Sequence, residues 1–476
     1  MNRKNFLKTA FVLGGMPAVG NKAASLFATG TAKSNSASPA YWKLAKTPPM
    51  GWNSYDTYGS SVTESEFLAN AKVLRKKLRR FGYKYAVIDF LWFDPFHAPE
   101  NIVEQKPTAI DKYGRCIPAL NKFPSAKGGA GFKPIAKKIH AMGLKFGIHI
   151  MRGIPRVAVK QNTPIKGTSY RAEDAADKNS VCSWNDDMYG VKGDTPAGQA
   201  YYNSLAQLYA RWGVDFIKVD DLSNPYHKDE IHAIRKALNQ HAPDIVFSTS
   251  PGETPVDQGD DIEHNANMWR ITGDFWDNWD SLNKTFEVLH RWRWSGQYYG
   301  GPGHWLDCDM LPFGRIGLRS VGGARFTNFT MDEQRVVMTL WSLAPSPLML
   351  GCNLTKLDPW TKDLITNKKV LAVNQDPLGK PGVRVAKLDT LEVWAKDLHD
   401  GSKAVGFFNR GSFDYKLSDA NLPHKKVTVT WQDLNIKGSQ VIYDLWNHQR
   451  LGTAKDSYTS HVPLHGAKFF RFIPQT

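Results

Sequence analysis

A short apolar run in this sequence ends in a lysine and an aspartate two residues apart. The run is VDFIKVDD at residues 214–221, and its composition predicts a buried strand. Successive side chains point to opposite sides of a strand, so Lys218 and Asp220 project together. Charged groups are tolerated inside a protein mainly when they are paired. This pair therefore belongs either to an active site or to a solvated strand end, and the segment alone leaves both open.

Other polar side chains stand at the ends of similar apolar runs. They are Trp52, Asp89, His149, Arg152, Arg270, Asp274, His304, Asp307 and Asp309. Aspartates, aromatic rings and a few cations that converge on one pocket suit a neutral ligand with many hydroxyl groups, because carboxylates accept hydroxyl hydrogens. We interpret His304 as structural.

Two carboxylates on either side of a glycosidic bond are sufficient to hydrolyse it, since one attacks or activates water and the other protonates the leaving oxygen. We select Asp220 and Asp274 as this pair. Lys218 lies about 6.6 Å along the strand from Asp220, and at an effective dielectric of ~20 it favours the ionised aspartate by roughly 2.5 kcal/mol. Asp274 is followed by Phe275 and Trp276, so we expect it to be the less solvated acid.

These residues would be positioned by eight strands that alternate with helices. The predicted strands are 49–53, 85–89, 145–151, 214–221, 245–249, 267–271, 304–310 and 347–350. The predicted helices begin after Thr63, at 133, 196, 228 and 279, after Thr330 and after Asp358. Eight such units favour a closed (β/α)8 TIM barrel over an open sheet, with the reactive groups at the strand ends. The long connections at 91–130 and 152–193 are expected to be functional loops.

The chain divides into four expected parts. Residues 1–32 resemble an export signal, with Arg3 and Lys4 before an apolar stretch and small residues after it. Residues 33–44 are a linker, and residues 45–380 form the catalytic barrel. Beyond them the pattern changes to period two, which predicts a C-terminal antiparallel β-sandwich at 381–476. No later run reaches the ~20 apolar residues that a membrane span needs, so we expect an exported protein, periplasmic, at the cell surface or secreted.

Composition excludes several other classes of function. The formal charge is +16, but five basic residues and no acid lie in the first 40 residues, which leaves 16 − 5 = +11 without them. The basic cluster at 75–80 is interpreted as a solvated helix face, so nucleic acid is not an expected partner. The four cysteines form no CxxC pair, and one disulfide is compatible with their number. Asp307 and Asp309 lack the oxygen ligands of a hard-cation site, so neither a metal nor a cofactor is expected.

Four motifs in order resemble glycoside hydrolase family 27, whose best-known members are α-galactosidases. They are PPMGWNS at 48–54, KVDD at 218–221, Arg270 with Asp274, and GPGHW at 301–305 followed by DCDM at 307–310. The resemblance implies a retaining, exo-acting double displacement with Asp220 as nucleophile and Asp274 as acid/base. It also implies a sugar subsite lined by Trp52, Asp89, His149, Lys218, Arg270 and Asp309. The implied substrate is a carbohydrate, a terminal α-D-galactose or β-L-arabinopyranose on an oligo- or polysaccharide.

Two departures from the family pattern leave the sugar open. Asp89 is followed by Phe90, where the galactosidases carry a second carboxylate, and the fifth strand is followed by SPGE at 250–253 instead of a Glu-Trp pair. Asp94 and Glu253 are candidates to replace the missing carboxylate. The alternatives are an α-glucoside-active member of the family and a sugar-binding barrel without catalysis.

Overall fold

The computed structural model describes residues 38–102, 108–294, 299–412 and 424–475. The expected export signal at 1–32 and the first part of the expected linker lie outside these residues. The described residues fall within one compact unit.

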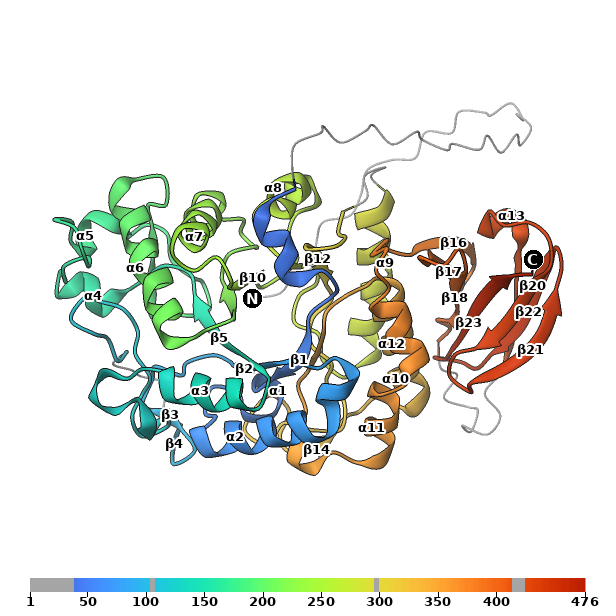
Figure 1. The fold of residues 1–476 in the computed structure, drawn as a ribbon, viewed down its shortest axis with the longest axis horizontal. Coiled ribbons are helices and arrows are strands. Elements are labelled where there is room, and N and C mark those ends of the chain that lie inside the picture. Colours follow the sequence, from blue (N-terminus) through green and yellow to red (C-terminus); the bar gives the residue numbers. More distant parts are fainter. Residues whose placement is uncertain (1–37, 103–107, 295–298, 413–423, 476) are drawn as a thin grey trace, which may run out of the picture. The chain divides into compact units, whose positions relative to one another are not determined.

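Eight parallel strands form the central sheet, in the order β12-β11-β10-β9-β5-β2-β1-β15 (Figure 1). Their bounds are β1 (Met50–Asn53), β2 (Tyr85–Ile88), β5 (Lys145–Met151), β9 (Phe216–Asp220), β10 (Val246–Thr249), β11 (Met268–Arg270), β12 (Trp305–Asp307) and β15 (Leu348–Leu350). The sheet curls until the chain just after β12 meets β15, where the Leu311 amide donates to the Met349 carbonyl at 2.8 Å. All eight predicted strands are present, and the prediction of a (β/α)8 barrel is confirmed.

Helices follow the barrel strands and lie on their outer side (Figure 1). The principal ones are α2 (Glu64–Val73), α3 (Lys133–Ala141), α6 (Pro196–Trp212), α7 (Lys228–His241), α9 (Trp279–Trp294), α10 (Met331–Leu343), α11 (Pro359–Ile365) and α12 (Lys368–Asn374). The predicted capping boxes are formed at Thr63 and Thr330, each with its glutamate three residues later. Between β10 and β11 the chain makes only short turns, η5 (Val256–Gln258) and α8 (Gly259–Glu263).

The two long connections contain short elements that their sequences did not indicate. The first holds β3 (His97–Ala98), β4 (Asn101–Ile102) and η4 (Pro124–Gly129), and the second holds β6 (Ile154–Pro155), α4 (Arg156–Lys160), α5 (Ala172–Ala175), β7 (Ala176–Asp177) and β8 (Met188–Val191). Strands β6, β8 and β7 form a small sheet within the connection at 152–193. These short elements do not lie in apolar runs like those that mark the barrel strands. The remaining short elements of the barrel are α1 (Tyr55–Tyr58), η2 (Leu74–Leu78), η3 (Arg79–Phe81), β13 (Arg315–Ile316), β14 (Arg325–Phe326) and η6 (Leu354–Lys356).

Helix η1 (Ala40–Ala45) corrects the expected linker at 33–44. The Tyr41 ring is buried under the guanidinium of Arg235, 3.7 Å from its centroid. The Trp42 ring lies 3.9 Å from the ring of His304, which precedes β12. Residues 40–44 therefore pack on the N-terminal ends of the barrel strands, because their aromatic side chains bury more surface there than a solvated linker would.

In its described residues, the C-terminal domain has two antiparallel sheets, in the orders β16-β17-β18-β23-β20-β21 and β19-β22. The elements are β16 (Val383–Leu388), β17 (Leu391–Asp397), β18 (Lys403–Asn409), β19 (Lys425–Thr430), α13 (Trp431–Leu434), β20 (Gln440–Asp444), β21 (Gln449–Ala454), β22 (Ser457–Val462) and β23 (Ala467–Pro474). Inward-facing side chains of both sheets, among them Val393, Phe407, Val429 and Phe470, share one apolar core. The predicted β-sandwich is confirmed.

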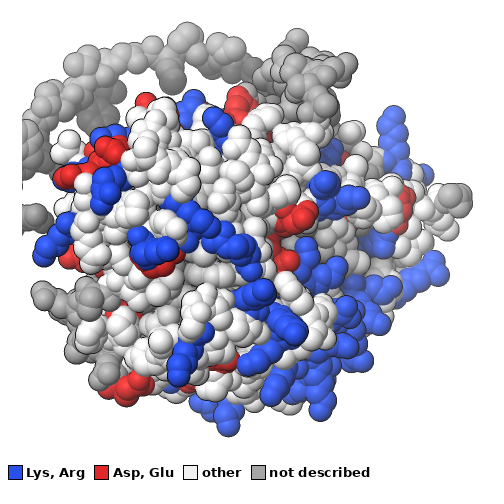
Figure 2. Space-filling view, turned by 60° about the vertical axis from the view of Figure 1, so that its left-hand side comes forward, with Lys and Arg blue, Asp and Glu red and all other residues white. Residues whose placement is uncertain are grey.

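Three surface and redox features bear on the sequence predictions. Basic side chains are abundant on the face drawn in Figure 2, and Arg75, Lys76, Lys77, Arg79 and Arg80 are all exposed, as expected for a solvated helix face. All four cysteines are free thiols, so the disulfide that their number allowed is not formed. Within the described residues, no helix combines the length and the apolar character that crossing a bilayer requires.

Candidate active site

A cavity of about 350 Å³ opens at the C-terminal ends of the barrel strands. Its lining comes from the ends of seven of the strands and from the segments that follow them: Tyr55, Asp56, Asp89, Phe90, Trp184, Lys218, Asp220, Pro251, Gly252, Arg270, Gly273, Asp274, Phe275, Trp276, Asp309 and Met310. The barrel thus brings together the polar strand ends that the sequence singled out, because the carboxyl ends of parallel strands meet on one face.

Asp220 ends β9 with its carboxylate against His149 of β5. The His149 Nε2 atom lies 3.0 Å from Asp220 Oδ2, and the Asp221 amide donates to Asp220 Oδ1 at 3.1 Å. Burial acts to raise the pKa of Asp220, but the hydrogen bond and charge of His149, with Lys218, outweigh it and hold the pKa well below its usual range. Asp220 is therefore an ionised carboxylate in the barrel mouth.

Lys218 projects beside Asp220 and forms an ion pair with Asp89 at the end of β2. The ammonium lies 3.4 Å from Asp89 Oδ2, which also accepts a hydrogen bond of 2.6 Å from Asn53. Burial opposes both charges, yet the attraction between them raises the pKa of Lys218 and lowers that of Asp89. A fixed ammonium and a fixed carboxylate side by side form a donor and acceptor pair for sugar hydroxyls.

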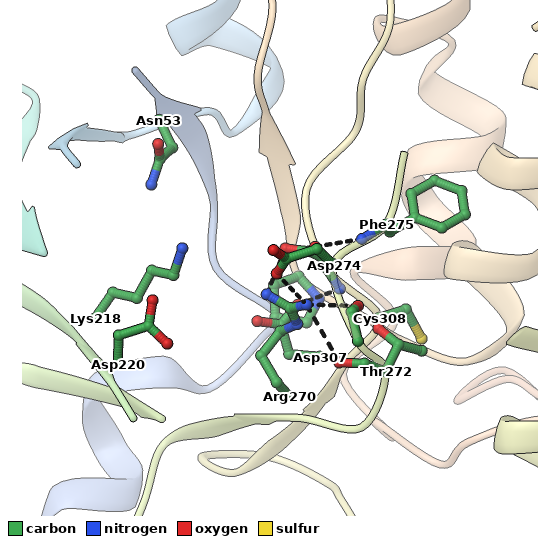
Figure 3. Close-up of polar contacts among 12 residues, drawn as sticks. Asn53, Lys218, Asp220, Arg270, Thr272, Asp274, Phe275, Asp307 and Cys308 are labelled. Atoms are coloured by element: carbon green, nitrogen blue, oxygen red, sulfur yellow. Dashed lines mark hydrogen bonds and ion pairs between the residues drawn. The ribbon is translucent and has the colours of Figure 1, made fainter. Parts of the chain in front are cut away.

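Arg270 organises the opposite side of the site (Figure 3). Its guanidinium contacts Asp309 Oδ1 at 2.9 Å and Asp274 Oδ1 at 3.2 Å, and it donates to the Gly273 carbonyl at 2.6 Å. Asp309 also accepts from the Phe275 amide at 2.8 Å. Burial opposes the charge of Arg270, but Asp309, then Asp274, raises its pKa. The arginine therefore fixes the turn that carries Asp274.

Asp274 differs from the sequence-based expectation in its environment. Its side chain is 67% exposed, although Phe275 and Trp276 follow it in the chain. The Phe275 side chain instead points away into the core, 4.8 Å from the ring of Trp341. The expectation of a poorly solvated acid at this position was wrong, and Asp274 stands at the cavity mouth, within reach of both a leaving group and water.

Two of the predicted sugar-contacting residues lie outside the cavity lining. Trp52 is fully buried and its indole donates to the Cys352 carbonyl at 2.7 Å, whereas Tyr55, three residues later, lines the cavity. His149 lies behind Asp220 and Phe90 and contacts both, so these two side chains separate it from the cavity. Both the predicted strand and β1 end at Asn53, so Tyr55 lies just beyond a strand end, where barrel cavities take their lining. This position in the sequence could have identified Tyr55 as a candidate.

Neither candidate for the missing carboxylate reaches the cavity lining. Asp94 accepts hydrogen bonds from the Phe96 amide and contacts His97 at 2.9 Å in the loop after β2. Glu253 forms a surface ion pair with Arg291 at 2.5 Å. The carboxyl group that the sequence reasoning missed is Asp56, at the start of α1.

A buried ion network fixes the backbone after Asp220. Arg152 donates to Asp221 Oδ2 at 2.7 Å and to Glu230 at 2.6 Å, and its own amide donates to the Asp220 carbonyl at 2.9 Å. Asp221 adopts a φ of 62°, a conformation that non-glycine residues seldom take. The arginine therefore holds the turn that aims Asp220 into the cavity.

This arrangement defines a class of protein, a glycosidase with an ionised carboxylate, an exposed second carboxyl group and several hydroxyl-binding charges in one pocket. Within the described residues, no group of three or more His, Cys, Asp and Glu side chains is arranged to hold a metal ion.

Comparisons with known proteins agree with this class. Residues 187–376 match the family model described as alpha galactosidase A, and residues 389–472 match the alpha galactosidase C-terminal beta sandwich domain. The chain is 45% identical to a GH27 β-L-arabinopyranosidase of Geobacillus stearothermophilus, covering 92% of this chain and 99% of that one with a TM-score of 0.86. It belongs to glycoside hydrolase family 27.

Two further relatives show how widely the likeness extends. A putative alpha-N-acetylgalactosaminidase of Bacillus halodurans is 41% identical, with 90% of this chain and 98% of that one covered and a TM-score of 0.78. An alpha-galactosidase of Cyamopsis tetragonoloba is 29% identical over 91% of this chain and 88% of its own length. Each of these three relatives is matched over at least 90% of this chain.

Proposed function

We propose that this protein is an exo-acting β-L-arabinopyranosidase that removes terminal β-L-arabinopyranose from oligo- or polysaccharides. β-L-Arabinopyranose has the ring of α-D-galactose without the hydroxymethyl group, so both sugars offer the same ring hydroxyls to the pocket. The choice between them rests on what meets that hydroxymethyl group.

Phe90 is the observation that carries the proposal. Its ring lines the cavity directly after Asp89, in contact with His149 at 5.4 Å and with Trp184 at 6.0 Å between ring centroids. An apolar ring offers no partner to the hydroxyl of a hydroxymethyl group, and a buried hydroxyl without a partner is costly. A sugar that lacks this group avoids the penalty.

The comparisons support the same choice. The chain is 45% identical to the Geobacillus protein that is named a β-L-arabinopyranosidase, and 29% identical to the Cyamopsis alpha-galactosidase. α-Galactosidase activity remains the second candidate, because the other cavity-lining charges would serve both sugars.

We expect the wild type to hydrolyse p-nitrophenyl β-L-arabinopyranoside with a kcat/KM at least about tenfold higher than that for p-nitrophenyl α-D-galactopyranoside. In the variant Phe90→Asp, a carboxylate could accept the hydroxymethyl hydroxyl, so the ratio is expected to move toward the galactoside. Initial rates of phenolate release measure both. A wild type that prefers the galactoside, or an α-glucoside included in the same series, would reject the proposal.

The same pocket supports a double displacement. Asp220, ionised and aimed by Arg152 and His149, attacks the anomeric carbon and forms a glycosyl ester, while Asp274 gives a proton to the departing oxygen. Asp274 then accepts a proton from water, which attacks the anomeric carbon and releases the sugar with its configuration retained. The exposure of Asp274 suits this second role, since water must reach it.

We also propose that the protein is exported, on the pattern of residues 1–32. The protein isolated from its host is expected to begin after about residue 32, because signal peptidases remove such segments. Amino-terminal sequencing after cell fractionation measures this. An intact amino terminus in the cytoplasmic fraction would contradict export and leave the proposed activity untouched.

A further inference from the structure

Asp56 is a carboxyl group in the cavity lining that has no part in the chemistry described above. It lies in the first turn of α1, directly after Tyr55, and is only 2% exposed although it lines the cavity. Its Oδ2 atom is buried and has no hydrogen-bond partner among the described residues. Such a group in a binding pocket calls for an explanation, because an unsatisfied buried polar atom is unfavourable.

The chain after β15 leaves room for this carboxyl group. A Cβ atom at Gly351 would lie 1.7 Å from Asp56 Oδ2, so any other residue at position 351 would displace the carboxyl group. The position of Asp56 therefore depends on the segments after two strands: β1, which precedes Asp56, and β15, which precedes Gly351.

The surroundings of Asp56 favour its neutral form. Burial, and then the negative charge of Asp309, raise the pKa of Asp56 well above its usual range, and Lys218 opposes them only in part. A protonated carboxyl group has an O–H that can donate as well as a carbonyl oxygen that can accept. It can therefore both donate a hydrogen bond to a sugar hydroxyl group and accept one from it.

We propose that Asp56 binds a ring hydroxyl of the sugar at O3 or O4, on the side remote from the anomeric carbon. Asp220 and Asp274 come from the ends of β9 and β11, whereas Asp56 follows β1, which lies between β2 and β15 on the other side of the barrel. The inference rests on the proposed function only as far as the pocket binds a pyranose, which arabinopyranose and galactose share.

The first test compares variants at this position. Asp56→Asn keeps the shape, one donor and one acceptor, so kcat/KM is expected to stay within about threefold of the wild type. Asp56→Ala and Asp56→Ser shorten the side chain, and kcat/KM is expected to fall about tenfold or more. Glu253→Gln, which neutralises a carboxylate outside the cavity lining, is the matched control and should change nothing. Thermal unfolding of each variant identifies any loss that comes from misfolding.

The decisive test uses deoxy sugars with the wild type, Asp56→Asn and Asp56→Ser. If Asp56 binds O3 or O4, the loss caused by Asp56→Ser disappears for the 3-deoxy or the 4-deoxy aryl glycoside and persists for the 2-deoxy compound. An equal loss of kcat/KM for the unmodified aryl glycoside and all three deoxy glycosides, or no loss for the unmodified glycoside, would overturn the proposal and make Asp56 a structural residue.

The result is independent of the preferred sugar. Each comparison is made within the series, arabinopyranoside or galactoside, that the wild type hydrolyses faster, so a preference for galactose rejects the proposed function without affecting this test. Calorimetric binding of the free sugar and its deoxy forms gives the same comparison without turnover.

Discussion

Replacing Asp220 with alanine is expected to lower the turnover of an aryl β-L-arabinopyranoside by roughly four orders of magnitude or more. The carboxylate that forms the glycosyl ester is removed, and no other cavity-lining carboxylate is aimed by the same His149 and Arg152 contacts. Phenolate release with the wild type and the variant at equal concentration measures the loss. Because Asp220 contributes little to the core, circular dichroism and the unfolding temperature should show a folded protein.

Azide provides the sharper measurement for this variant. The small anion can enter the space left by the Asp220 carboxylate and attack the anomeric carbon directly, which produces a glycosyl azide of inverted configuration. Asp244→Ala makes the same chemical change at an exposed aspartate before β10 and serves as the control. Hydrolysis by Asp220→Ala at the wild-type rate would remove Asp220 from the nucleophile role.

Replacing Asp274 with alanine is expected to have the second largest effect, and its size should depend on the leaving group. A general acid contributes about 10²–10⁴-fold, so a poor leaving group such as a sugar should suffer most. A dinitrophenyl leaving group needs no proton, so the glycosyl ester should still form and then accumulate, because its hydrolysis lacks a base. A burst of phenolate followed by slow turnover is the expected trace.

Azide distinguishes the two carboxyl groups. In Asp274→Ala the nucleophile is intact, so azide attacks the glycosyl ester and the product retains its configuration, in contrast to Asp220→Ala. Azide should also restore steady turnover, since it needs no base. An equal loss with sugar and dinitrophenyl leaving groups, and no response to azide, would contradict the acid/base role of Asp274.

The sequence by itself determined the architecture. Eight apolar runs, most of them followed by an amphipathic helical segment, were enough to place every barrel strand, because apolar runs and helix periods are local properties of the chain. The change to period two at 381 likewise located the β-domain. The strand-end polar residues were also visible, since a charged residue at the end of a buried run is unusual wherever the strand lies.

The tertiary structure decided which of those residues meet in the cavity and in what state. Trp52 and Tyr55 are three positions apart, and only the turn after Asn53 determines that the tyrosine lines the cavity while the tryptophan packs in the core. The exposure of Asp274 follows from the path of its turn around Arg270, which local sequence does not encode.

Asp56 illustrates the same limit for charge. Its sequence neighbours are tyrosine and threonine, and nothing in them distinguishes it from a solvated aspartate. Its burial and its raised pKa come from Gly351 and Asp309, about 250 to 300 positions away, which closure of the barrel brings beside it. The sequence determined the strands and the polar residues at their ends. Desolvation and Coulomb interactions depend on distance in space, so the closed barrel decided which of these residues line the cavity and which carboxyl groups are protonated.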